Sequence, residues 1–181
     1  MSNLESQCSS SDSRDCPPPP LVERIASKKA MVGESLPISR ALPNPRRRMI
    51  GAWCFLDHAG PVGPGSEMRV GPHPHIGLQT FTWMIEGKLL HRDSLGYEQL
   101  IQPGQVNLMT AGRGISHSEE SVAEPGVGLH LAQLWIALPD ATRSIEPAFE
   151  HYAVLPQRAL DGFALTLLAG EFGGLVAPSR V

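Results

Sequence analysis

Short apolar runs separated by glycine and proline dominate the pattern of this chain. Turn-forming pairs such as Gly60-Pro61 and Pro103-Gly104 recur throughout it. The segments between the turns are rich in branched and aromatic side chains and cover residues 53–56, 80–85, 106–110, 129–138 and 163–169. Short segments at this spacing predict β-strands and an all-β sandwich or barrel. Sustained helical periodicity is missing, and we expect at most one or two helical turns, at residues 147–155.

The composition is that of a compact globular protein. Hydrophobic residues make up 41% of the 181 residues and charged residues only 18%, a balance unlike that of disordered chains. The length predicts one domain, with a tail or part of a second unit. The formal net charge is -3, and the dense cationic run Arg46-Arg47-Arg48 is short. Direct nucleic-acid binding through a basic surface is therefore not expected.

The sequence lacks the signals of a membrane or secreted protein. No window approaches the ~18 consecutive apolar residues of a membrane span, and the first residues have neither part of a secretory signal. Cys8, Cys16 and Cys54 are too few and too scattered for a disulfide framework. We therefore expect a cytoplasmic protein without membrane contact.

The two ends of the chain differ from its middle. Residues 1–20 are rich in serine and proline, and we expect them to form a disordered tail. Residues 161–181 contain one buried strand over 165–170 and the start of another near Gly173. A strand pair at the end of a chain leaves an open edge. This predicts either a homodimer through that edge or a chain that ends inside a second domain.

Two short motifs place four metal-ligating side chains at strand spacing. His73-Pro74-His75 and His117-Ser118-Glu119 each carry two such side chains at positions i and i+2. Side chains at that spacing share one face of a β-strand. The residues between the motifs leave room for three or four short strands, so the two pairs can meet inside a small barrel.

Three imidazoles and one carboxylate form a mixed nitrogen and oxygen ligand set. The set suits Fe(II), Mn(II), Ni(II), Cu(II) and Zn(II), and spacing does not choose among these ions. One H-x-H motif alone is weak, because surface histidines often have that spacing. Pro74 also restricts the first pair to a strand start or an edge strand. The two motifs together favour a metal site.

A longer series of motifs resembles the pirin family of the cupin superfamily, in the right order from about residue 22 to the C-terminus. The series includes Phe55-Leu56-Asp57-His58-Ala59-Gly60-Pro61, His73-Pro74-His75-Ile76-Gly77-Leu78, His91-Arg92-Asp93-Ser94-Leu95-Gly96, Met109-Thr110-Ala111-Gly112-Arg113-Gly114 and His117-Ser118-Glu119. The resemblance implies two tandem cupin domains, each a jelly-roll barrel (double-stranded β-helix). Residues 21–160 would form the N-terminal barrel with the metal site, and residues 161–181 the opening strands of a truncated second domain.

The resemblance also implies a ligand set and a function. The family's metal, usually iron and hence Fe(II) here, carries over onto His73, His75, His117 and Glu119. Some bacterial pirins open the flavonol quercetin with dioxygen, which predicts a quercetin 2,3-dioxygenase whose substrates are a flavonol and O₂. Others, especially nuclear pirins of animals, are iron-dependent transcriptional co-regulators. The alternative is therefore a non-enzymatic, redox-sensing module that binds a protein partner.

Glu119 has two open roles within this interpretation. As a ligand that leaves the metal, it would be a catalytic residue that accepts the proton of a substrate hydroxyl. As a fixed ligand, it would only balance the charge of the ion. If His75 faces inward, strand alternation would place Phe81, Trp83 and Ile85 inward with it, as an apolar slot for an aromatic ligand.

The chain departs from the family at Ile76 and Gln79, where pirins commonly have arginine and glutamate. We expect this change to remove an ion pair near the mouth of the pocket. It would alter the accepted substrate or partner without abolishing the metal site.

Two further histidines have a carboxylate nearby in the sequence. His91 with Asp93, and His58 with Asp57, are candidates for orienting the ligand imidazoles from outside the ligand set. A hydrogen-bonded histidine in a turn is the commoner arrangement, and we expect it here.

Overall fold

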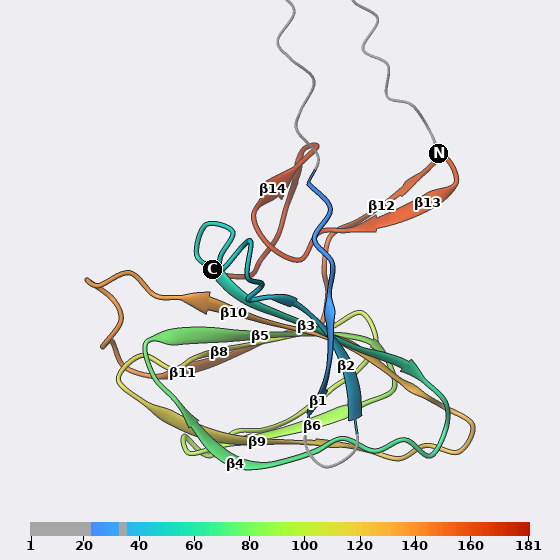
Figure 1. Cartoon of the computed structure of the whole chain (residues 1–181), viewed down its shortest axis with the longest axis horizontal. Helices are drawn as coiled ribbons and strands as arrows, with labels where there is room; N and C mark the ends of the chain where they lie inside the picture. Colours follow the sequence, from blue (N-terminus) through green and yellow to red (C-terminus); the bar gives the residue numbers. More distant parts are fainter. Residues whose placement is uncertain (1–22, 33–35) are drawn as a thin grey trace, which may run out of the picture.

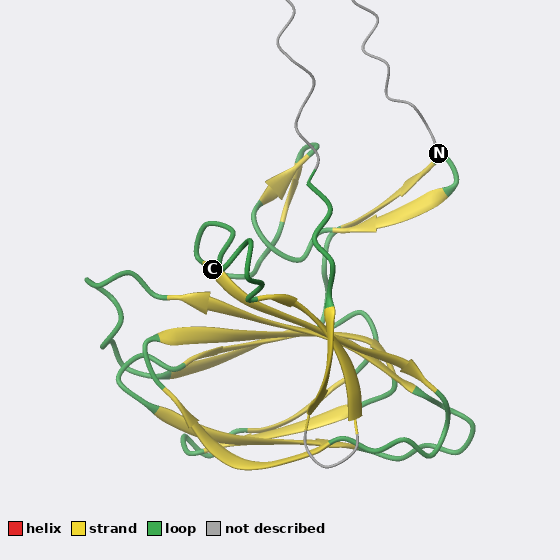
Figure 2. Cartoon of the chain, in the orientation of Figure 1, coloured by secondary structure: helices red, strands yellow, loops and turns green. Residues whose placement is uncertain are grey.

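The computed structural model describes residues 23–32 and 36–181, which form strands joined by turns and loops (Figures 1 and 2). Two antiparallel sheets lie face to face, and two short hairpins lie apart from them (Figure 1). The all-β prediction is confirmed. The predicted tail at residues 1–20 lies outside the described residues. In the described part of the chain, no helix is long and apolar enough to cross a membrane.

The larger sheet has seven strands and contains most of the segments predicted from the sequence. Its order is β1-β2-β3-β10-β5-β8-β11. The strands are β1 (Lys28–Val32), β2 (Leu36–Leu42), β3 (Trp53–Val62), β10 (Leu129–Ala137), β5 (Leu78–Glu86), β8 (Val106–Thr110) and β11 (Ala148–Tyr152).

The smaller sheet has four strands and carries both histidine motifs. Its order is β4 (Arg69–His75), β9 (Ile115–Ser121), β6 (Leu89–Asp93) and β7 (Glu98–Ile101). Four strands, β5 to β8, separate His75 from His117, as the spacing predicted. Because β4 is an edge strand, Pro74 has no ladder position that requires an N–H donor, and the expectation of an edge strand is confirmed.

Two hairpins follow the sheets near the C-terminus. The first pairs β12 (Gln157–Leu160) with β13 (Phe163–Thr166), and the second pairs β14 (Glu171–Phe172) with β15 (Leu175–Val176). The strand expected over 165–170 thus ends at Thr166. The hairpins bond to neither large sheet, and the assignment of residues 161–181 to a second domain stays a prediction.

The main core lies between the two sheets, and a second apolar cluster covers the outer face of the larger one. The main core consists of Leu36, Ile38, Ala59, Met68, Met84, Leu89, Ile101, Leu129 and Leu131. The outer cluster consists of Phe81, Val106, Leu108, Ile136 and Leu155. Buried polar side chains, among them His91, His117 and Glu119, share the space between the sheets with this core.

The helical turn expected over residues 147–155 is wrong, because that segment forms strand β11. Its residues pair with β8, with Phe149 opposite Met109. Phe149 packs with Met109, Ala111 and Ile115 in a small buried cluster. Pairing with the open edge of β8 therefore outweighs the weak local preference of the segment.

Gly112 forms the turn that leads from β8 to β9 and so sets the position of the second ligand motif. Its φ is 51°, a left-handed conformation that favours glycine. A Cβ atom at this position would lie 2.1 Å from the carbonyl oxygen of Ile145. The Gly112 carbonyl accepts a hydrogen bond from the N–H of Gly77 at 2.8 Å, which ties the turn to the end of β4.

Replacement of Gly112 by alanine should lower the free energy of unfolding by about 2–4 kcal/mol, because the left-handed strain adds to a backbone clash. Gly104→Ala is the matched control, since Gly104 also has a positive φ (83°) but no atom within 4 Å of the place that an added methyl group would take. The control should lose only about 1–2 kcal/mol. Urea denaturation measures both, and equal losses would show that the close approach to Ile145 does not matter.

Candidate metal centre

Strand β9 carries the second ligand motif and lies between the two strands that complete the site. His117 is paired with His73 of β4, and Glu119 is paired with His91 of β6. Both His117 and Glu119 are buried. Ser118 between them and Ser116 before them are more exposed. The period-two alternation of a strand therefore directs His117 and Glu119 into the space between the sheets.

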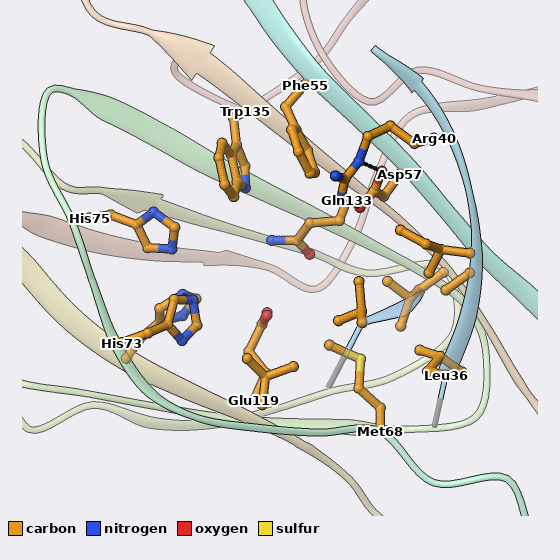
Figure 3. Close-up of a pocket in the computed structure, with 16 residues that line it drawn as sticks. Leu36, Arg40, Phe55, Asp57, Met68, His73, His75, Glu119, Gln133 and Trp135 are labelled. Carbon is orange, nitrogen blue, oxygen red and sulfur yellow. Dashed lines mark hydrogen bonds and ion pairs between the residues drawn. The ribbon is translucent and has the colours of Figure 1, made fainter. Parts of the chain in front are cut away.

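Three of the four predicted ligands meet at one point. The nearest ring nitrogens of His73, His75 and His117 all lie within 4.8 Å of one another. The Nε2 atoms of His73 and His117 are 3.1 Å apart. In Figure 3, His73 and His75 both point toward the interior of the cavity. The structure thus groups the three histidines in a way that suits a metal ion.

The proton on His73 can be assigned from its hydrogen bond. His73 Nδ1 lies 2.9 Å from the carbonyl oxygen of Gly71, and a carbonyl oxygen only accepts. In the neutral ring, Nδ1 therefore carries the hydrogen, and Nε2 presents its lone pair to His117. This is the tautomer that a metal ligand needs, with the second ring nitrogen held by a backbone acceptor.

Glu119 lies beside the histidine group without being a full member of it. Its carboxylate belongs to an overlapping group with His117 and His91, whose ligand atoms lie within 4.8 Å of one another. The Thr82 hydroxyl lies 3.4 Å from Glu119 Oε1 and 2.8 Å from Gln133 Oε1. Glu119 and the three histidines nevertheless line the same cavity (Figure 3).

Burial changes the protonation of these groups in opposite directions. Burial, with a smaller contribution from His73, lowers the pKa of His75 to about 4. Burial, with neighbouring imidazoles, lowers the pKa of His117 to about 2. Burial raises the pKa of Glu119 to about 7, and the Thr82 hydroxyl opposes this rise. His75 and His117 are therefore neutral at neutral pH, which is the form that binds metals.

The cavity beside these side chains has a volume of about 260 Å³. Its far half is apolar, with walls that include Leu36, Ile38, Met68, Val70 and Leu131. The ligand cluster occupies the other half, and Gln133 lies between the two (Figure 3). A molecule with a polar edge and an apolar body matches this division.

One wall of the cavity is an ordered aromatic and ionic stack. The rings of Phe55 and Trp135 are stacked with centroids 4.1 Å apart, and Trp135 meets His75 edge-on. The Arg40 guanidinium lies 4.4 Å from the Phe55 centroid and donates two hydrogen bonds of 2.7 Å to Asp57. The bonds to Asp57 raise the pKa of Arg40 despite its partial burial. The stack gives the cavity a flat, rigid side.

The apolar slot expected from Phe81, Trp83 and Ile85 is wrong. None of these side chains lines the cavity, and Phe81 belongs to the outer apolar cluster. His75 ends β4 in one sheet, and β5 begins in the other sheet, so alternation does not continue from His75 into β5. The aromatic wall comes instead from Phe55 and Trp135 on β3 and β10.

The expected position of Ile76 and Gln79 at the pocket mouth is also wrong. Ile76 is 69% exposed and Gln79 is buried, and neither lines the cavity. The Gln79 side-chain amide donates a hydrogen bond of 3.0 Å to the hydroxyl of Thr110, its partner on the neighbouring strand β8. These two departures from the family pattern therefore do not line the cavity beside the ligand cluster.

The two candidate pairs of histidine and carboxylate have different outcomes. His91 Nε2 lies 3.2 Å from Asp93, and His91 Nδ1 lies 3.4 Å from His117, so this pair does contact a predicted ligand. His58 instead contacts His130 at 2.7 Å, and its neighbour Asp57 binds Arg40. Sequence reasoning missed Thr82 and Gln133, whose residue types are common at polar positions of any strand.

Two facing antiparallel sheets with histidines clustered between them define a β-barrel protein with a candidate metal centre. The family model described as Pirin matches residues 35–136, more than half of the chain. A Pseudomonas aeruginosa protein named, provisionally, as a quercetin 2,3-dioxygenase is 56% identical over 185 residues, which cover 100% of this chain and 58% of that protein. A pirin-like protein of Caulobacter vibrioides is 44% identical over 146 residues, which cover 76% of this chain and 51% of that protein. The chain belongs to the pirin family of the cupin superfamily and spans about half the length of these relatives.

Solved structures agree with this assignment. A crystal structure of quercetin 2,3-dioxygenase from Acinetobacter baumannii has a TM-score of 0.81 and 57% identity, covering 86% of this chain and 52% of that one. A bacterial pirin from Escherichia coli in complex with nickel(II) has a TM-score of 0.59 and 27% identity, covering 73% of this chain and 57% of that one. The predicted cupin fold and the family resemblance are confirmed.

The low pKa of His75 predicts a specific acid sensitivity of the metal-free protein. Between about pH 6.5 and 4, an unfolded chain binds a proton at His75 and the folded chain does not, so the contribution of His75 to stability falls as the pH falls. His75→Gln should remove this dependence, worth at most about 3 kcal/mol over that window. Urea unfolding in the presence of a chelator, across that pH range, measures it. Glu119 changes stability with pH in the opposite direction, but it does so in both the wild type and His75→Gln and cancels in their comparison. Parallel curves of stability against pH for the two proteins would contradict the low pKa of His75.

Proposed function

We propose that this chain carries the metal centre of a dioxygenase that opens quercetin-type flavonols, with Fe(II) as the resident ion. One observation carries the proposal: three histidines and a buried carboxylate lie at one end of a cavity with a flat aromatic wall. The names of the Pseudomonas and Acinetobacter relatives support the reaction, and the nickel complex of the Escherichia coli pirin supports a transition metal. Mn(II), Ni(II), Cu(II) and Zn(II) suit the same donor set.

In this proposal, His73, His75, His117 and Glu119 hold the metal. The Nε2 atoms of His73 and His117 are 3.1 Å apart, about the distance between two nitrogens that bind the same metal ion. The carboxylate of Glu119 supplies the negative charge that three neutral imidazoles lack. When bound, the metal would supply Lewis acidity toward the flavonol oxygens and the chemistry of dioxygen.

The cavity would orient the flavonol by its shape and polarity. The oxygen-bearing edge of the flavonol would face the histidines, and its ring system would lie along the stacked rings of Phe55 and Trp135. The apolar residues at the far end would exclude water from the remaining ring. Gln133 is placed to hydrogen-bond a substrate oxygen because its side chain lies between the two halves.

We propose Glu119 as the group that accepts the proton of the flavonol hydroxyl. Its carboxylate points into the cavity, and its nearest hydrogen-bond partner among the described residues is the Thr82 hydroxyl. Burial raises the pKa of Glu119 in the metal-free protein, so a Glu119 carboxylate that leaves the metal is a stronger base than an exposed carboxylate. This assigns Glu119 a catalytic role in addition to its role as a ligand.

Removal of one histidine tests the metal site. Protein purified without an affinity metal column should contain close to one equivalent of transition metal, and His117→Ala should lose most of it. His151→Ala is the control, because His151 bonds Asn107 and does not line the cavity. Elemental mass spectrometry gives the answer. Equal metal in the wild type and His117→Ala would remove His117 from the ligand set.

Replacement of the carboxylate by its amide tests the proton acceptor. Glu119→Gln keeps the size of the side chain but removes its basicity, so quercetin consumption at saturating metal should fall about 10²–10⁴-fold. The loss of quercetin absorbance under air follows the reaction, and metal content is measured on the same sample. Glu120→Gln, at an exposed neighbouring position, should retain full activity. A Glu119→Gln variant with full metal and normal turnover would rule out the proton-accepting role.

A further inference from the structure

A chain of three buried side chains runs from Asp93, the last residue of β6, to the ligand cluster. Asp93 Oδ2 lies 3.2 Å from His91 Nε2, and His91 Nδ1 lies 3.4 Å from His117 Nδ1. The side chains of His91 and Asp93 are 3% and 0% exposed, and His117 is equally buried. Asp93 is paired with His117 across the two strands, so the backbone register holds the group together.

The direction of hydrogen donation along this chain follows from its first member. A carboxylate only accepts, so the ring hydrogen of neutral His91 lies on Nε2 and points to Asp93. His91 Nδ1 then carries a lone pair, and it can only accept from His117. His117 must therefore carry its hydrogen on Nδ1, which leaves the lone pair of Nε2 directed toward His73, 3.1 Å away.

We propose that Asp93, acting through His91, fixes the tautomer of His117 and so makes Nε2 of His117 available as a metal ligand. Asp93 and His91 are positioning residues in this inference, which rests on the metal site proposed above. On the other side of the cluster, the Gly71 carbonyl fixes the same tautomer in His73. Two lone pairs held face to face disfavour the empty arrangement and favour a cation between them.

We call the chain of Asp93, His91 and His117 the Asp93 relay. Two sets of contacts hold its first two members in place. Asp93 Oδ1 accepts hydrogen bonds from the backbone N–H groups of Leu95 at 2.9 Å and Tyr97 at 3.1 Å, which leaves Oδ2 to His91. The ring of His91 is stacked on Phe149 with centroids 4.4 Å apart and an interplanar angle of 18°. The position of the carboxylate and the plane of the imidazole are therefore both set from outside the ligand cluster.

Asp93→Asn tests the relay because it should reverse every donor without removing a contact. The oxygen of the new side-chain amide can still accept from Leu95 and Tyr97, which places the NH₂ group of that amide against His91 Nε2. His91 then has to carry its hydrogen on Nδ1 and donate to His117, whose own hydrogen moves to Nε2. Nitrogen-15 correlation spectra of the chelator-treated protein, at mildly alkaline pH, distinguish a protonated ring nitrogen from one with a lone pair. We expect His117 to carry its hydrogen on Nδ1 in the wild type and on Nε2 in Asp93→Asn.

The same variants give a second measurement through metal affinity. Titration with Zn(II) alone should show affinity about 10–100-fold weaker in Asp93→Asn, the usual effect of losing a group that orients a ligand. Asp140→Asn, at a fully exposed position, is the control and should bind Zn(II) like the wild type. Neither measurement involves quercetin, so an inactive wild type with the predicted tautomer would refute the proposed reaction and leave the relay standing.

Two outcomes would overturn the relay. One is a wild-type His117 with its hydrogen on Nε2, a result that does not depend on whether Asp93→Asn folds. The other is a change at His91 Nδ1 on Zn(II) binding that matches the change at His117 Nε2. That result would make His91 a direct ligand, consistent with the second group of His91, His117 and Glu119.

Discussion

The position of β9 between β4 and β6 is the constraint on which the candidate site depends. A strand inside a sheet has neighbours on both sides, and its pleat directs alternate side chains to one face. His117 and Glu119 of β9 therefore face inward together, with His73 on one neighbouring strand and His91 and Asp93 on the other. Because the register is fixed by backbone hydrogen bonds, five chemically active side chains are brought together by strand pairing alone.

Desolvation between the two sheets determines the chemical state of these side chains. Burial keeps His75 and His117 neutral and favours the protonated form of Glu119, in both cases because a charge in this space has little water to stabilise it. Neutral imidazoles are good ligands, and a bound cation would in turn favour the charged form of the carboxylate. The polar cluster is therefore poorly satisfied by itself and well suited to a positive ion.

The cavity, the aromatic wall and the Asp93 relay act on different parts of the same proposed chemistry. Phe55 and Trp135 provide a flat surface at a fixed distance from the histidines, and Arg40 with Asp57 secures one end of that surface. Asp93 and His91 do not line the cavity, and they act from behind the ligand cluster. A substitution in the wall should therefore change substrate preference, whereas one in the relay should change the metal site.

The sequence by itself determined the strand-rich fold, the restriction of Pro74 to a strand start or an edge, and the shared face within each of the pairs His73–His75 and His117–Glu119. These features depend on turn residues and on period-two alternation, which are local properties of the chain. Alternation failed at Phe81, Trp83 and Ile85, because His75 and β5 lie in different sheets and a period cannot be carried through the turn that joins them. Only the tertiary structure brought Phe55 and Trp135 to the cavity, and only it brought the pair of Asp93 and His91 to His117. Those contacts depend on which strands pair and in which register, and burial of the whole core decides both.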